Sequence, residues 1–252
     1  PYITLSLIFL TFFSLIKIKI LLIWIFLYVT FFFTGFIDDK IQLNAKSKTF
    51  ILLFVLFVTL PLDKGLIISS LEFKNLDYVV LLNQGSLFFT IFCIYLFYNS
   101  LNFADGLNGI SIALSIFFIV LLLKITNQVN IFHYSILISL LILFIPNIFG
   151  KIFLGNSGIS FISCVFSLLF IDAYNNKDIL FDEIMLVVFL PCVDAARVTV
   201  ERIISGESPF KSDKNHFHHL LMKIFHKKYV FIPYSIFAVM PYLITTLDVY
   251  TY

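Results

Sequence analysis

The sequence predicts an all-α fold, a polytopic transmembrane helix bundle of about nine helices. Of its 252 residues, 60% are hydrophobic and only 13% are charged. Soluble domains carry about 25% charged residues, and the mean hydropathy of this chain is +1.02. Apolar runs that are long enough to cross a bilayer recur along the whole chain. We therefore expect a protein embedded in the lipid bilayer, with no nucleic-acid partner.

The predicted spans follow one another with short connections. They cover residues 2–16, 20–37, 47–62, 86–102, 108–124, 132–149, 158–174, 180–200 and 230–250. The first and third are short for a bilayer core, which needs about 20 apolar residues. Prolines in or near three spans do not exclude helices, because membrane helices tolerate proline. No linker divides the chain, so residues 1–252 are predicted to form a single integral membrane domain.

Basic residues are distributed unevenly between the two faces that these spans define. The connections after the second, fourth, sixth and eighth spans, with their edges, hold eleven of the seventeen Lys and Arg residues. Cytoplasmic loops carry the excess of Lys and Arg, so this face is predicted to be cytoplasmic. Every polar cluster that indicates chemistry lies on the same face. The four clusters are DD at 38–39, NFADGLNG at 102–109, GKIFLGNSG at 150–158 and KSDKNHFHHLLMK at 211–223.

The first cluster, Asp38 and Asp39, directly follows the second predicted span. Carboxylates at a helix C-terminus oppose the helix macrodipole, and Lys40 compensates for this only in part. A helix that simply enters water explains the doublet. A divalent cation explains it equally well, because Mg²⁺ prefers carboxylate oxygens completed by substrate phosphate. These two residues alone leave both interpretations open.

The next two clusters combine polar side chains with glycine. Asn102, Asp105 and Asn108 recur at every third position and would form one polar stripe on a helix, which favours a site over a plain turn. Asn156 lies in LGNSG, just before an apolar run. There, glycine-flanked amides and a helix N-terminus could bind phosphate. A tight turn that ends in an N-cap residue explains the same pattern.

Three histidines, His216, His218 and His219, lie in KNHFHH among basic residues. One interpretation is a basic helix on the anionic cytoplasmic leaflet, with the apolar residues of 220–225 facing lipid. The other is a cationic pocket for a nucleotide diphosphate. A zinc site ranks lower because no Cys or well-placed carboxylate completes a tetrahedral set. The three cysteines lie in apolar runs and are interpreted as buried thiols.

The four clusters together, in this order and on one face, resemble the polyprenyl-phosphate N-acetylhexosamine-1-phosphate transferases. The matching stretches are GFIDD, NFADGLNGI, KIFLGNSG and SPFKSDKNHFHHLLM, within residues 20–229. The resemblance implies transfer of a UDP-activated N-acetylhexosamine-1-phosphate to a polyprenyl (undecaprenyl) phosphate, with release of UMP, to initiate cell-envelope polysaccharide synthesis. It implies Mg²⁺ as cofactor, with Mn²⁺ as a substitute. It also implies a multi-pass protein of the bacterial inner membrane, with a cytoplasmic active site, and it allows a homodimer.

The resemblance also assigns roles to the acidic residues. Asp38 and Asp39 match the acidic pair of the family, and we expect Asp38 to position or deprotonate the lipid phosphate. Asp39 and Asp105 are expected to bind Mg²⁺. Asn102, Asp105 and Asn108 match the polar stripe that lines the uridine and phosphate site of the family.

The remaining assignments concern the nucleotide sugar. Phe153 matches the aromatic residue that stacks on uracil, and Arg202 matches a basic residue that precedes the SPF segment. His216, His218 and His219 match the histidine motif that contacts the nucleotide sugar. HFHH after SPFKSDKN resembles the GlcNAc and O-antigen branch, since the muramoyl-pentapeptide branch carries an HHHFE-type string. The expected donor is therefore a UDP-N-acetylhexosamine.

Two departures from the family pattern matter. The position of Asn156 is usually Asp in the family and supplies a metal ligand. Asparagine keeps one carbonyl oxygen but lacks the charge, which either weakens Mg²⁺ binding or shifts it toward Asp38, Asp39 and Asp105. The family also begins with further membrane segments that nothing here matches, so the chain is expected to lack these N-terminal helices.

Two alternatives compete with an active transferase. A transporter would carry ionisable residues at mid-span along a pathway, whereas here the charge collects at one face. A catalytically impaired family member would bind UDP-sugar or lipid phosphate without turnover, an alternative that Asn156 motivates. For a transferase, both reactants are anions, so Mg²⁺ and basic loops are needed to neutralise them and hold them in line.

Overall fold

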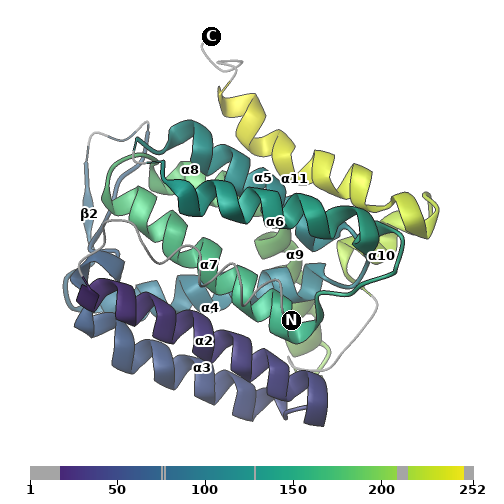
Figure 1. Ribbon diagram of the computed structural model, residues 1–252, viewed down its shortest axis with the longest axis horizontal. Coiled ribbons are helices and arrows are strands. Elements are labelled where there is room, and N and C mark those ends of the chain that lie inside the picture. The colour runs from purple at the N-terminus through teal and green to yellow at the C-terminus, as the bar shows by residue number, and fades with distance from the viewer. Residues whose placement is uncertain (1–17, 75, 77, 128, 209–214, 247–252) are drawn as a thin grey trace.

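The computed structural model confirms the all-α architecture (Figure 1). It describes residues 18–74, 76, 78–127, 129–208 and 215–246. Within these residues, a two-stranded antiparallel hairpin is the only sheet, formed by β1 (Ser70–Leu71) and β2 (Val80–Leu81). The hairpin lies at the left-hand end of the bundle in Figure 1.

Ten α-helices make up the described bundle. The eight longer helices are α2 (Ile18–Ile41), α3 (Ala45–Thr59), α4 (Ser86–Ala104), α5 (Ile110–Ile125), α6 (Ile131–Ile148), α7 (Gly155–Asn175), α9 (Phe189–Ile204) and α11 (Phe231–Thr246). The two short ones are α8 (Phe181–Val187) and α10 (Phe217–Leu221). Six described helical segments are long and apolar enough to cross a membrane, and α5 is a shorter apolar helix. The chain is therefore a multi-pass membrane protein.

The predicted span 180–200 is wrong as a single helix. Val188 separates α8 from α9. Pro191 has no N–H to donate to the carbonyl four residues earlier, and its ring crowds that carbonyl, which breaks the helix at this point. Neither α8 nor α9 is among the six candidate spans. The predicted span 2–16 and the last residues of 230–250 lie outside the described residues, so the count of about nine stays a prediction.

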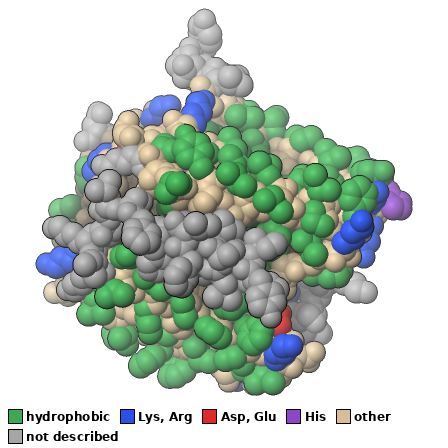
Figure 2. Space-filling model, viewed as in Figure 1, with side chains coloured by type: hydrophobic (Ala, Val, Ile, Leu, Met, Phe, Trp, Pro, Cys, Tyr) green, Lys and Arg blue, Asp and Glu red, His purple; other side chains and the backbone are tan. Residues whose placement is uncertain are grey.

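The centre of the bundle is α7. Of the 18 residues in its apolar stretch, 72% are buried inside the protein. The corresponding value is 17% for α6 and for the segment Lys227–Thr246, which contains α11. It packs along α2 and α4. Phe26, Phe54 and Phe88 on outer helices are exposed, as expected for side chains that face lipid. Figure 2 shows hydrophobic side chains over much of one face, with Lys and Arg at its edges.

The ends of several helices meet at the end of the bundle opposite the hairpin. The last turn of α2, the first turn of α7 and the short helix α10 all lie toward the right-hand side of Figure 1. The polar clusters that the sequence singled out fall on these ends and on the connections between them.

Candidate active site

Asp39 joins the end of α2 to the beginning of α7. Its Oδ1 accepts a hydrogen bond from the Asn156 amide at 2.8 Å, and its Oδ2 accepts one from the Ser157 amide at 3.0 Å. These amides have no partner within their own helix, and they carry the positive end of its dipole. The charge that is unfavourable at the end of α2 is thus stabilised by α7. The N-terminus of α7 therefore offsets the unfavourable interaction of Asp39 with the dipole of α2.

Two glycines allow this junction. A Cβ at Gly35 would lie 2.2 Å from the Asn156 carbonyl oxygen, so only glycine lets α2 approach α7 so closely. Gly155 has φ +65°, and a Cβ there would lie 2.9 Å from Asp39 Oδ2. Its left-handed backbone favours glycine on conformational grounds as well. The carboxylate of Asp39 therefore lies directly against the backbone of the first turn of α7.

Asn102 and Asn156 bring a third helix to the same place. Asn102, in the last turn of α4, donates from Nδ2 to Asn156 Oδ1 at 3.3 Å. Asn156 thus contacts Asp39 through its backbone amide and Asn102 through its side-chain oxygen. The structure brings these three predicted residues together from α2, α4 and α7.

Asp105 lies immediately after α4 and is largely enclosed. Its Oδ1 accepts a hydrogen bond from Ser111 Oγ at 2.5 Å. The pKa of Asp105 is raised to about 7: burial raises it most, the hydrogen bond from Ser111 lowers it, and the negative charge of Asp39 raises it. The two carboxylates therefore repel each other electrostatically, and a cation between them would relieve this repulsion.

Asp38 has different partners from its neighbour. Its Oδ1 accepts a hydrogen bond from the Leu43 amide at 2.8 Å, and its Oδ2 accepts one from Lys48 Nζ at 2.7 Å. The Asp38 and Lys48 side chains are only 12% and 14% exposed, so this ion pair is screened less than a surface pair. Asp38 joins the end of α2 to the start of α3. Its expected role toward a lipid phosphate stays a prediction.

Asn147, which sequence reasoning missed, joins the connection after α4 to the one after α6. Its Oδ1 accepts a hydrogen bond from the Gly109 amide at 2.7 Å, and its Nδ2 donates to the Ile152 carbonyl at 3.0 Å. Asn108 borders the same contact, because a Cβ at Gly150 would lie 3.3 Å from Asn108 Nδ2. The NFADGLNG and GKIFLGNSG clusters are therefore neighbours in space.

Phe153 lies in the connection between α6 and α7 and is 74% exposed. An exposed ring at the rim of a polar cluster can stack on a planar ligand. Its assignment to uracil stays a prediction.

The histidine segment packs against the connection after α4. The His216 ring lies 5.0 Å from the Phe103 ring, centroid to centroid. His218 is stacked parallel to His216 at 5.7 Å, and a Cβ at Gly106 would lie 2.4 Å from His218 Nε2. Glycine at 106 is thus required for the histidine ring to lie against the backbone next to Asp105.

His218 is buried and electrically neutral near pH 7. Neither of its ring nitrogens has a hydrogen-bond partner among the described residues. The pKa of His218 is lowered to about 4: burial lowers it most, the neighbouring His219 and His216 also lower it, and Asp194 opposes them. A buried imidazole with two unpaired nitrogens is a candidate for hydrogen bonding to a bound ligand.

His219 and Arg202 complete the predicted set. The His219 ring lies 4.2 Å from the His218 ring, centroid to centroid. Arg202 is buried, and its guanidinium carbon lies 5.6 Å from the centroid of the Phe103 ring. Both residues therefore belong to the cluster on the connection after α4.

The histidine segment does not form the long basic helix on the cytoplasmic leaflet that was one interpretation of its sequence. The helix α10 has only five residues. The basic and apolar residues at 222–229 follow it in an exposed connection. Residues 211–214 of the predicted cluster lie outside the described residues, as do most of the SPFKSDKN residues.

The acidic end of the site fits an open Mg²⁺ site. The side chains of Asp39, Asp105 and Asn156 can coordinate a metal only through oxygen, which is the ligand atom that Mg²⁺ prefers. Within the described ranges, no three His, Cys, Asp or Glu side chains converge on a closed metal centre. One or two carboxylates completed by substrate phosphates are sufficient for Mg²⁺. Asp39 can still coordinate, because a carboxylate offers about four lone-pair sites and the two amides occupy two.

The sequence did not indicate three residues that hold the predicted site residues, or the loops that carry them, in place. Ser111 binds Asp105, Asn147 orders the loops, and Asp194 on α9 binds His216 at 3.1 Å. A signal for Asp194 was available, since it is an ionisable residue inside a predicted span. The other two gave none, because single Ser and Asn residues are common at turns.

Comparison with known proteins shows the family of this chain. Residues 21–174 match the model of glycosyl transferase family 4, and the chain belongs to this family. The match includes the acidic doublet, the connection after α4 and the beginning of α7, whereas the histidine segment lies beyond it. The resemblance inferred from the sequence motifs is thereby confirmed.

Two relatives illustrate the similarity. The chain is 26% identical over 219 residues to a decaprenyl-phosphate N-acetylglucosaminephosphotransferase of Mycobacterium leprae (strain TN), covering 76% of this chain and 55% of the relative. It is 23% identical over 203 residues to an undecaprenyl-phosphate alpha-N-acetylglucosaminyl 1-phosphate transferase of Escherichia coli (strain K12), again covering 76% and 55%. The chain therefore spans about half the length of the curated relatives it matches.

Proposed function

We propose that this protein is a phosphotransferase that moves a UDP-activated N-acetylhexosamine-1-phosphate to a membrane polyprenyl phosphate. One observation carries the proposal. Asp39, Asn102, Asp105 and Asn156 gather where α2, α4 and α7 meet, and the histidine segment packs on the same connection. Membership of glycosyl transferase family 4 and the names of the relatives support the same reaction.

In the proposed reaction, an oxygen of the lipid phosphate attacks the β-phosphorus of the UDP-sugar. A new P–O bond joins lipid phosphate to sugar phosphate, the bond between the α- and β-phosphates breaks, and UMP leaves. Bound Mg²⁺, or Mn²⁺ in its place, supplies positive charge to the phosphate oxygens. Asp39, Asp105 and Asn156 would hold it, while the first turn of α7 orients the carboxylate of Asp39.

The remaining residues bind and orient the two substrates. Asn102 and Asn108 line the phosphate side, and Phe153 stacks on the uracil ring. His216, His218, His219 and Arg202 bind the nucleotide sugar from the other side of the connection after α4. Asp38 accepts one hydrogen bond from Lys48 and one from the Leu43 amide, which leaves about two of its lone-pair sites for the lipid phosphate.

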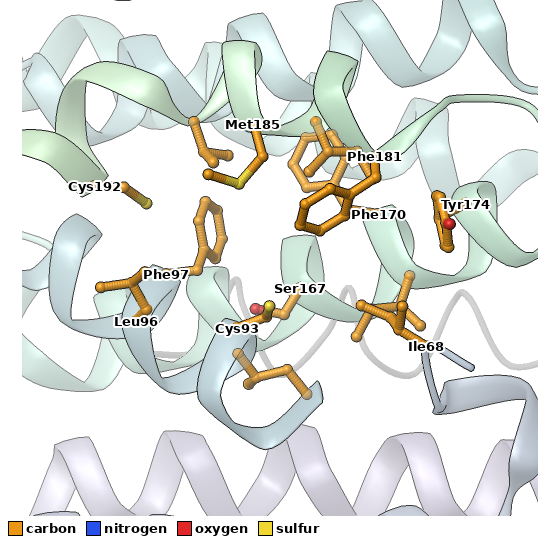
Figure 3. A pocket seen from close by; sticks show the side chains of 14 residues that line it. Ile68, Cys93, Leu96, Phe97, Ser167, Phe170, Tyr174, Phe181, Met185 and Cys192 are labelled. Carbon is orange, nitrogen blue, oxygen red and sulfur yellow. The ribbon is translucent and has the colours of Figure 1, made fainter. Parts of the chain in front are cut away.

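The lipid chain has a candidate site along α4. An apolar cavity of about 90 Å³ lies between α4, α7 and the α8–α9 pair, and its lining includes Phe97, Phe170 and Met185 (Figure 3). Cys93 and Cys192 also border it; Cys192 is buried, as expected, whereas Cys93 is only partly buried. The cavity lies on the helix whose last turn carries Asn102. We assign it to part of the polyprenyl chain.

The same proposal places the protein in the bacterial plasma membrane, with the active site facing the cytoplasm. The supporting observation is the excess of Lys and Arg at the connections that carry the polar clusters. The product would initiate cell-envelope polysaccharide synthesis. A homodimer stays a prediction.

A transfer assay tests the proposal. Membranes that contain the protein are incubated with polyprenyl phosphate and a UDP-N-acetylhexosamine labelled in the sugar, first with Mg²⁺ and then with EDTA. We expect labelled lipid and one UMP per product with Mg²⁺, and neither with EDTA. Asp63→Ala, at an aspartate that caps a turn after α3, is the matched control and should retain activity. Label transfer without UMP release contradicts the reaction, and equal transfer in EDTA contradicts the metal assignment.

A second candidate is a family member that binds its substrates without turnover. The observation that favours it is that the Asn156 side chain accepts a hydrogen bond from Asn102, in a position where the family usually has a carboxylate. Asn156→Asp separates the two candidates. If only this variant transfers sugar phosphate, the natural protein is impaired at the metal site. If the natural protein transfers it already, the second candidate is excluded.

A further inference from the structure

A buried carboxylate outside the predicted site holds the histidine segment. Asp194, on α9, is 6% exposed. Its Oδ2 lies 3.1 Å from His216 Nδ1, and its Oδ1 accepts hydrogen bonds from the Phe217 amide at 3.0 Å and from Arg197 at 2.9 Å. Both oxygens are therefore used, and two of the three partners belong to the histidine segment.

Asp194 is ionised at neutral pH in spite of its burial. Burial raises the pKa of Asp194, but the bonds from His216, Arg197 and the Phe217 amide outweigh this effect and leave the pKa below its ordinary value. An ionised carboxylate can only accept hydrogen bonds. His216 must therefore donate from Nδ1, which fixes its ring orientation and leaves Nε2 as the nitrogen available to a ligand.

The contact reaches the rest of the site through His216. The ring of His216 packs on Phe103, and it stacks on His218, which in turn lies against Gly106. Phe103 and Gly106 flank Asp105 in the connection after α4. A displacement of His216 would therefore be transmitted to the connection after α4, on the side of the site assigned to the nucleotide sugar.

We propose that Asp194 is a positioning residue for UDP-sugar binding, which fixes the orientation and tautomer of His216 and seats the histidine segment on the connection after α4. The inference rests on the proposed function. Asp194 touches no reacting atom and acts through His216. Outer partners of metal-binding histidines typically contribute about 10- to 100-fold to metal affinity or activity, and we expect an effect of similar size for Asp194 on substrate binding.

The test is a double-mutant cycle on the full chain in membranes. Asp194→Asn presents an amide to His216 and allows the opposite tautomer. We expect a rise of about 10-fold or more in KM for the UDP-sugar, with unchanged KM for polyprenyl phosphate. His216→Gln should have a similar effect. The double variant should be no worse than His216→Gln alone, because residues that act through one contact are not additive.

The matched control is Glu201→Gln. Glu201 also pairs with Arg197, at 2.7 Å, but its side chain is 48% exposed, and among the described residues it forms no hydrogen bond with the histidine segment. It should leave both KM values unchanged. Multiplicative losses in the double variant, or equal effects of Asp194→Asn and Glu201→Gln, contradict the inference. A lower melting temperature with an unchanged KM for the UDP-sugar shows a purely structural role and contradicts it too.

Two further arms keep the outcome decisive. If Asp194→Asn does not fold, Asp194→Glu keeps the charge but moves it by one methylene group, and normal KM for the UDP-sugar in that variant overturns the inference. If the wild type transfers no sugar, the proposed function fails. In that case, equilibrium binding of labelled UDP-sugar to the same variants still tests Asp194, and undiminished binding by Asp194→Asn contradicts its role.

Discussion

The two halves of the candidate site are built in different ways. At the acidic half, Asp39 is held by backbone amides at the start of α7, and two glycines bring the helices close enough. At the histidine half, one buried carboxylate on α9 holds an aromatic stack of side chains. The backbone amides of α7 are held by the helix itself and keep their positions when a side chain at the site is replaced. The orientation of the histidine rings, in contrast, depends on the side chain of Asp194. We therefore expect substitutions in the two halves to affect different steps.

The largest effect is expected at the acidic half, from Asp39→Ala. The variant loses a proposed Mg²⁺ ligand and leaves two amides of α7 unpaired. Transfer activity should fall by about 10²–10³-fold, the loss typical for one electrostatic group in an active site. The free energy of unfolding should fall by only about 1–2 kcal/mol, the usual contribution of a helix cap. Activity within a few fold of wild type, measured by the labelled-sugar assay, would remove Asp39 from the metal site.

The next effect concerns pH and the histidine half. Because the pKa of His218 is lowered to about 4 in the folded protein, the unfolded state binds the proton more tightly. The stability from neutral His218 is present above pH ~6.5 and is lost as pH falls toward ~4, by about 2–3 kcal/mol. Thermal melting at pH 7 and pH 4.5 measures it. His218→Phe should flatten this dependence, and a slope equal to that of wild type would contradict the assignment.

A smaller effect is expected from Gly35→Ala. The new methyl group would lie 2.2 Å from the Asn156 carbonyl oxygen, so α2 and α7 must separate. The free energy of unfolding should fall by about 1–3 kcal/mol, and half-saturating Mg²⁺ should rise. Gly85→Ala is the control, since a Cβ there meets no atom within 4 Å. Equal melting temperatures and equal Mg²⁺ responses of the two variants would show that the close approach is unimportant.

The smallest effect is expected from Phe153→Leu. Because Phe153 is exposed, its replacement should leave the melting temperature unchanged. Loss of stacking on uracil should raise KM for the UDP-sugar by about 5- to 10-fold, which corresponds to roughly 1 kcal/mol. Steady-state kinetics at saturating lipid measures this change. An unaltered KM would move the uracil contact elsewhere.

The sequence was sufficient for the membrane bundle and for the positions of most helices, because long apolar runs leave few alternatives. It failed at 180–200, where apolar composition hid the break at Val188 before Pro191. The polar clusters pointed to Asp39, Asn156 and His216, but neither to Asp194 nor to the contact between Asp39 and Asn156. Asp39 meets Asn156 across 117 positions of sequence, and His216 meets Asp194 across 22. Such pairs depend on helix packing, which spacing along the chain does not encode.

The dependence of sugar-phosphate transfer on free Mg²⁺ tests the account most directly, with wild type and Asp39→Asn compared in the same membranes. We predict that wild-type transfer rises from zero in EDTA to a plateau. Asp39→Asn should need more Mg²⁺ and reach a lower plateau. A wild-type rate that is independent of Mg²⁺, or identical Mg²⁺ curves for the two proteins, would contradict a metal site where α2, α4 and α7 meet.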